Sequence, residues 1–180
     1  IEQLTQIYLE HGGGGNNFES YNFPWYFAAF HTVHDSMEKR GKRGYLFTVG
    51  DEESPQALTR AQIKQFIGDD LENELTPKEM LQIAQRTYDV YHVIIEEGDH
   101  ARLNLQKVLD SWTVLLGQHV IRLADHTKLA ETIVSAIEVA EGADADVSAA
   151  AWGKDTKAIV HAAVKNLPRR PEPPRLGGPA

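Results

Sequence analysis

Three runs rich in apolar residues, without polar alternation, divide the chain at residues 45–49, 90–95 and 119–123. Runs of this length, bounded by glycine or charged residues, are typical of strands buried on both faces of a parallel sheet. The first run, Tyr-Leu-Phe-Thr-Val, is the one around which we expect the chain to be organised. The third run is shorter, which predicts a place nearer the edge of the sheet.

Stretches with helical periodicity separate these strands. The apolar spacing predicts helices at residues 23–37, 58–67, 103–116 and 155–167, one beginning at the Thr76 capping box and one opening at Thr127. Strands that alternate with helices form parallel sheets through right-handed crossovers. The predicted fold is therefore α/β, a Rossmann-like three-layer αβα arrangement with a parallel sheet.

Composition changes twice towards the end of the chain. Residues 1–141 carry the strand and helix pattern, residues 142–167 read as a small polar linker and a C-terminal helix, and residues 168–180 contain five prolines. A segment so rich in proline cannot build a core, so we expect an extended tail. At the other end, Leu4, Ile7 and Tyr8 lie at helical spacing before a run of four glycines.

Charge and composition exclude several classes of protein. The net charge is −8, which argues against broad binding to nucleic acid, and the absence of cysteine excludes disulfides and thiolate zinc sites. We see no signal peptide and no apolar stretch of membrane-spanning length. The expected setting is cytoplasmic, with no membrane partner.

Asp51 is the first candidate for chemistry because it follows the first predicted strand directly. Ligands of open parallel sheets bind outside the carboxyl ends of the strands. The plain alternative is an aspartate that caps a helix or terminates the strand. The glycine-rich stretch Gly-Gly-Gly-Gly-Asn-Asn-Phe-Glu-Ser, at residues 12–20, favours the ligand-binding interpretation.

Together, this stretch and Leu-Phe-Thr-Val-Gly-Asp-Glu at residues 46–52 resemble the second loop and fourth strand of von Willebrand factor A (vWA) domains. The resemblance covers the C-terminal half of such a domain, of the bacterial intracellular type. It implies a divalent-cation site of the kind called MIDAS, where Mg²⁺ is held by oxygen ligands. By position, the resemblance implies Asn16 and Asp51 as metal ligands.

The chain departs from the family pattern in one respect. The family's first metal loop, Asp-x-Ser-x-Ser, is not found in the sequence, and the family's first three strands are apparently absent as well. Since the chain begins with Ile1 rather than methionine, we expect it to start midway through a larger domain. The Mg²⁺ shell would then be incomplete in this chain.

The histidines give a weaker signal. His31 and His34 are three residues apart, a spacing that can put two imidazoles on one helix face, but no third ligand follows at a recognised spacing. His92 lies inside a predicted strand and is expected to be a hydrogen-bonded core residue.

These features predict a protein–protein interaction module, not an enzyme, whose partner is another protein or protein complex. One alternative is a metal-assisted hydrolase or phosphoryl-transfer enzyme that uses Asp51, although no phosphate loop or nucleophile elbow is found. A structural subunit of a larger assembly is a further alternative.

Overall fold

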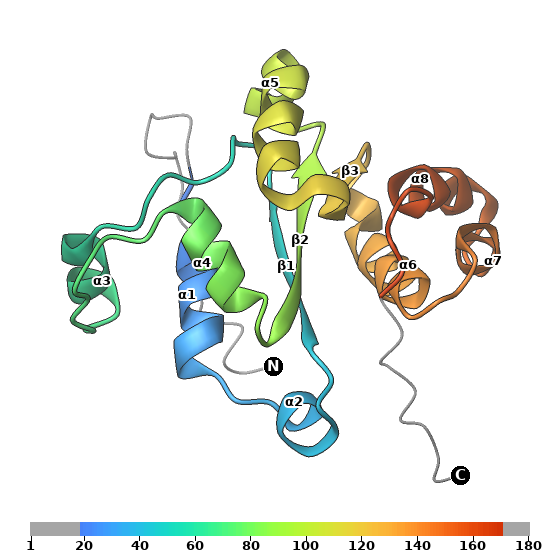
Figure 1. Cartoon of the computed structure of the whole chain (residues 1–180). Coiled ribbons are helices and arrows are strands. Elements are labelled where there is room, and N and C mark those ends of the chain that lie inside the picture. Colours follow the sequence, from blue (N-terminus) through green and yellow to red (C-terminus); the bar gives the residue numbers. More distant parts are fainter. Residues whose placement is uncertain (1–18, 171–180) are drawn as a thin grey trace, which may run out of the picture.

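The computed structural model describes residues 19–170 (Figure 1). Along the chain, the described elements are α1 (Asn22–His31), α2 (Asp35–Arg40), β1 (Gly44–Gly50), α3 (Arg60–Phe66), α4 (Pro77–Ala84), β2 (Tyr88–Ile95), α5 (Asp99–Leu116), η2 (Gly117–His119), β3 (Val120–Leu123), η3 (His126–Lys128), α6 (Leu129–Ala140), α7 (Ala145–Ala150) and α8 (Lys154–Val164).

The three strands form one parallel sheet in the order β1-β2-β3. Each of the three predicted strands is confirmed, and β3 lies at the edge as its short length predicts. In β1 and β2, Gly44 pairs with Tyr88 and the register runs on to Gly50 and Ile94. The chain is therefore a mixed α/β protein with a parallel sheet flanked by helices, which is compatible with a Rossmann-like αβα fold.

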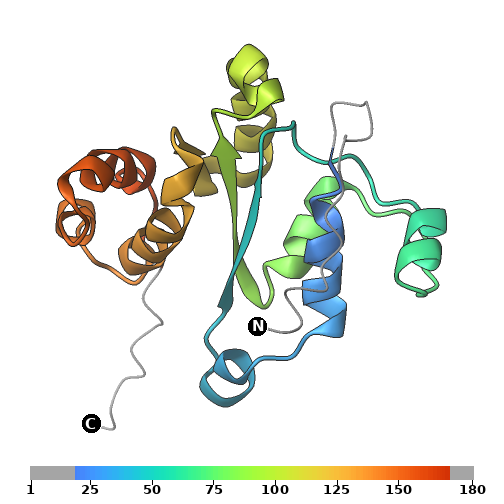
Figure 2. The ribbon, with the colours of Figure 1, turned by 180° about the vertical axis from the view of Figure 1, so that it is seen from behind.

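Side chains of β2 alternate between two apolar clusters, one on each face of the sheet. Val90 and Ile94 pack with Trp25, Met80 and Trp112, which come from α1, α4 and α5. On the other face, a second cluster joins β2 and β3 to α6 and α8; it contains Tyr91, Val93, Ile121, Leu123, Val139 and Val164. Figures 1 and 2 show α1 and α4 on one side of the strands and α6 and α8 on the other.

β1 is less buried than its sequence predicts. Thr48 is buried, but the strand is otherwise partly exposed and the side chain of Val49 is 37% exposed. The physical reason is position, because within residues 19–170 β1 pairs with β2 on one side alone. The prediction of a strand buried on both faces is therefore wrong for β1 and holds for β2, which lies between two neighbours.

The predicted helix over residues 23–37 is wrong, because the structure breaks it into α1 and α2. The Thr32 hydroxyl donates to the carbonyl of Ala28 at 2.5 Å, and the Thr32 backbone is extended. The ring nitrogen Nδ1 of His34 then accepts from the Met37 amide at 3.2 Å and begins α2. Two side-chain bonds that satisfy backbone groups at the break therefore replace the continuous helix.

Other helices agree with the sequence to differing degrees. The Thr76 capping box with Glu79 is confirmed, and α4 follows it. The helix expected from Thr127 begins at Leu129, after a short 3-10 turn. Part of the linker expected after residue 142 is helical, because the Asp144 carboxylate accepts from the Asp146 and Val147 amides and begins α7.

Arg170 ties the end of the described chain to the amino end of the sheet. Its guanidinium donates to Asp89 Oδ2 at 2.7 Å, to Glu141 Oε1 at 2.9 Å and to the Arg43 carbonyl at 3.0 Å. The same group lies 4.4 Å above the ring of Tyr45. The bonds to Asp89 and Arg43 fix the position of residue 170 beside the start of β1 and β2.

Each helix in residues 19–170 is too short or too polar to cross a membrane.

Candidate functional site

Carboxylates gather where the three parallel strands end. β1 is followed by Asp51, Glu52 and Glu53, β2 by Glu96 and Glu97, and β3 by Asp125 a residue later. Because the strands are parallel, their carboxyl ends all lie at the same end of the sheet. This end, which we call the carboxylate edge, is the place to search for a binding site.

Asp51 contacts the beginning of α5. Its Oδ2 accepts a hydrogen bond from the His100 amide at 3.0 Å, in the first turn of that helix. The approach is close because residue 98 is glycine, and a Cβ at Gly98 would lie 2.3 Å from the Asp51 Cβ. Asp51 therefore caps a helix, as the plain alternative expects, although the helix is α5 and not the next one in sequence. The bond uses one of its two carboxylate oxygens.

Glu52 and Glu53 lie on either side of the His100 ring. His100 Nδ1 is 3.5 Å from Glu52 Oε2, and His100 Nε2 is 3.6 Å from Glu53 Oε1. Lys107 Nζ lies 2.7 Å from the same Glu53 oxygen. Burial raises the pKa of Glu52 above its ordinary value, and the nearby His100 opposes this. The side chains of His100, Glu52 and Glu53 are mostly buried, and their contacts pack the loop after β1 against α5.

Helix α5 also holds the backbone of this loop. Trp112 Nε1 donates to the Glu52 carbonyl at 2.9 Å, and Ser111 Oγ accepts from the Ser54 amide at 3.0 Å. Both side chains are on the helix that Asp51 caps. The loop is therefore attached to α5 through its backbone as well as through its carboxylates.

Tyr21 brings the segment before α1 to the same edge. A Cβ at Gly50 would lie 1.9 Å from the Tyr21 hydroxyl oxygen, so glycine is required there for the ring to fit. The ring also meets Trp112 edge-on, with the centroids 5.3 Å apart. Burial is the main reason that the pKa of the Tyr21 phenol is raised above its ordinary value.

The structure cannot place the second predicted metal ligand. Asn16 and the glycine-rich stretch at residues 12–17 lie outside the described residues. The expected approach of Asn16 to Asp51 therefore stays a prediction. The position of Tyr21, a few residues after that stretch and against Gly50, is compatible with it.

A second group at the carboxylate edge was not found from the sequence. Ligand atoms of Glu97, Asp125 and His126 lie within 4.8 Å of one another. However, Glu97 Oε2 accepts from the His126 amide at 2.8 Å, and Asp125 Oδ1 accepts from the Thr127 amide at 2.9 Å. The bond from the His126 amide lowers the pKa of the Glu97 carboxyl, and the Thr127 hydroxyl, followed by the Thr127 amide, lowers the pKa of the Asp125 carboxyl. These bonds explain the group as the start of a helical turn. The sequence signal for this group is that Glu97 follows one predicted strand and that Asp125 and His126 follow the next.

His31, His34 and His92 each have a structural contact within the fold. His31 ends α1 and its Nε2 lies 2.7 Å from Asp69 Oδ2, whereas His34 begins α2 and its Nδ1 lies 2.6 Å from Ser36 Oγ. The predicted core role of His92 is confirmed, since its Nδ1 is 2.9 Å from Thr48 Oγ1 and its ring stacks on Trp112. Burial lowers the pKa of His92 to about 3, so the ring is neutral near pH 7.

Comparison with known proteins adds no relative. No family model matches the chain, and no match was found among curated proteins or among solved structures.

Proposed function

We propose that this chain is a vWA-like protein–protein interaction module that binds another protein through its carboxylate edge. The observation that carries the proposal is the convergence of Asp51, Tyr21 and the beginning of α5 at the end of β1. Contacts from α5 fix the loop after β1 on a parallel sheet, at the edge where such folds bind their ligands. Rigid support of this kind suits recognition of a partner with little rearrangement.

The described residues do not by themselves fit a magnesium ion. Mg²⁺ requires near-octahedral coordination by oxygen and loses its waters reluctantly. Of the predicted ligands, the described part of the chain contains Asp51, one of whose oxygens already caps α5. In this proposal Mg²⁺ binds only where Asn16 and oxygen ligands from outside this chain complete the shell. Binding of a partner does not depend on the cation alone.

Asp51→Asn and Asp51→Ala separate a ligand role from a capping role. The asparagine oxygen can still accept from the His100 amide, so Asp51→Asn keeps the cap and removes the charge. Asp51→Ala removes both. Asp35→Ala is the control, because Asp35 is an exposed carboxylate that pairs with Lys39 in α2, near the amino end of β1.

The test compares which proteins these variants of residues 1–180 retain from an extract of the cells that make this protein, identified by mass spectrometry. We expect a discrete set bound by the wild type and by Asp35→Ala, and lost from both Asp51 variants. Retention of the same set by Asp51→Asn would contradict a role for the charge. Retention by Asp51→Ala, with its fold verified by circular dichroism, would contradict the proposal.

A further inference from the structure

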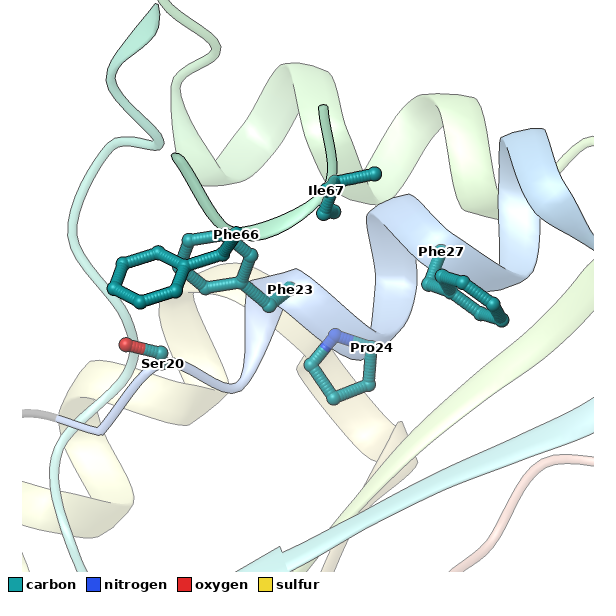
Figure 3. Close-up of a pocket in the computed structure, with 6 residues that line it drawn as sticks. All are labelled: Ser20, Phe23, Pro24, Phe27, Phe66 and Ile67. Atoms are coloured by element: carbon teal, nitrogen blue, oxygen red, sulfur yellow. The ribbon is translucent and has the colours of Figure 1, made fainter. Parts of the chain in front are cut away.

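An apolar pocket opens between α1 and α3, and its lining contains none of the carboxylates of the carboxylate edge. Its volume is about 430 Å³, and the residues that line it are Ser20, Phe23, Pro24, Phe27, Phe66 and Ile67 (Figure 3). The side chains of Phe27 and Phe66 are 52% and 67% exposed. Two aromatic side chains in one pocket lining that are exposed to this degree mark a surface that another segment or molecule can cover.

Helix α1 carries apolar residues on more than one face, which explains the pocket. Trp25 and Tyr26 are buried in the core against the sheet and α4. Phe23 and Phe27 are four residues apart and so lie together on a different face. Phe66 from α3 meets Phe23 edge-on at a centroid distance of 5.8 Å. A surface helix of a folded domain normally has one apolar face, so this second face is a candidate for contact with a further apolar segment.

We propose that residues 1–9 of the same chain cover this pocket, through the apolar face formed by Leu4, Ile7 and Tyr8. These residues lie outside the described part of the chain, and the proposal rests on their sequence. Their helical spacing puts three large apolar side chains on one side and Gln6 on the opposite side. Such a face is complementary to a pocket lined almost wholly by aromatic and aliphatic side chains.

The covalent connection favours this segment over any molecule in solution. Ser20 itself lines the pocket, and residues 10–19 join it to the segment through four consecutive glycines. Ten residues span at most about 35 Å, which is ample for the segment to return along α1, a ten-residue helix. A short flexible linker gives an effective concentration in the millimolar range, so a weak apolar contact suffices.

Disulfide trapping in residues 1–180 tests the proposal directly. The chain has no cysteine, so a designed pair reacts without competition. A disulfide forms where two Cα atoms come within about 7 Å. Leu4→Cys and Ile7→Cys are each combined with Phe66→Cys, an exposed position at which the core is left intact. The control combines the same cysteines with Val147→Cys, a 70% exposed position on α7, on the other side of the strands from α3.

We expect at least one pocket pair to form an intramolecular disulfide about tenfold faster than its Val147 control, because docking raises the local concentration beyond that set by the tether. Equal rates for the pocket and control pairs would overturn the proposal. Covalent dimers in place of monomers would overturn it too, since they would assign the pocket to a second copy of the chain.

A second measurement leaves the pocket unaltered. The change Ile7→Asp should uncover the pocket and raise the fluorescence of an added apolar dye severalfold. Gln6→Asp adds the same charge at the neighbouring position, on the polar side, and should leave the fluorescence unchanged. Equal fluorescence of the two variants would overturn the proposal. Neither measurement involves Asp51, so this inference and the proposed function can fail separately.

Discussion

Substitution of Gly98 by alanine tests whether the contact between Asp51 and α5 holds the carboxylate edge together. The new Cβ would lie 2.3 Å from the Asp51 Cβ and 2.4 Å from its Oδ2, so Asp51 must leave the helix end. Overpacking of this kind costs about 1–3 kcal/mol, and loss of a capping bond costs about 1 kcal/mol. Alanine also reduces the conformational freedom of the unfolded chain, which stabilises the variant by about 0.4–1 kcal/mol. The expected net loss is about 2 kcal/mol.

Gly153→Ala is a closely matched control. Gly98 and Gly153 are both N-cap residues with a φ of −58°, at the beginning of α5 and α8. A Cβ at Gly153 would meet no atom within 4 Å. The two substitutions therefore share every effect of glycine replacement except the collision with Asp51. Gly153→Ala should change the free energy of unfolding by less than about 0.5 kcal/mol.

Urea unfolding followed by circular dichroism measures both variants. The expected loss corresponds to a melting temperature lowered by about 4–8 °C for a chain of this size. A second background identifies the cause, because Asp51→Gly removes the colliding atoms. In that background, Gly98→Ala should cost no more than Gly153→Ala does. An equal cost of Gly98→Ala with and without Asp51 would refute the reasoning.

Three further predictions concern the cation, the core and the sheet edge. Calorimetry should detect weak or no Mg²⁺ binding by residues 1–180, because Asn16 and Asp51 leave the shell incomplete; tight binding would contradict this. The pKa of His92 is lowered to about 3, so folding keeps it neutral while the unfolded chain protonates it below about pH 6.5. The part of the free energy of unfolding that depends on neutral His92 is therefore lost as pH falls below about 6.5, by about 2 kcal/mol at pH 5. Denaturation at pH 7 and pH 5 should show a smaller loss in His92→Phe, and an equal loss would contradict the assignment. In hydrogen exchange, the amides of β1 (Gly44–Gly50) should be protected alternately, since β1 pairs with β2 alone in residues 19–170. Uniform protection would show that another strand pairs with the side of β1 opposite β2.

The apolar runs located all three strands because a strand buried between helices must be apolar wherever it touches them. The same logic failed for the exposure of β1, since burial depends on which strands lie beside it. Val49 and its neighbours do not reveal from their own sequence that β1 lies at the edge of the described sheet. The break between α1 and α2 was missed for a different reason. It depends on individual bonds from Thr32 and His34, which apolar spacing does not record.

The candidate site was predictable only in part. Asp51 follows an identifiable strand, so its place at the carboxyl end of the sheet followed from the pattern. His100 and Lys107 come from α5, which a crossover brings back to the sheet, and no local spacing connects them to Glu53. The meeting of Glu97 with His126 likewise depends on the pairing of β2 with β3. Asn16 lies outside the described residues, so its predicted role remains untested.

The position of Arg170 determines how the protein can be attached to a surface. Its bonds to Asp89 and the Arg43 carbonyl hold residue 170 at the amino end of the sheet, whereas Asp51 follows the carboxyl end of β1. Seven strand residues, or about 23 Å, separate the two ends. A tag or dye joined directly after residue 170 would therefore start at the end of the sheet away from Asp51. Immobilisation at that point leaves the carboxylate edge facing solution, and the binding comparison above should use that orientation.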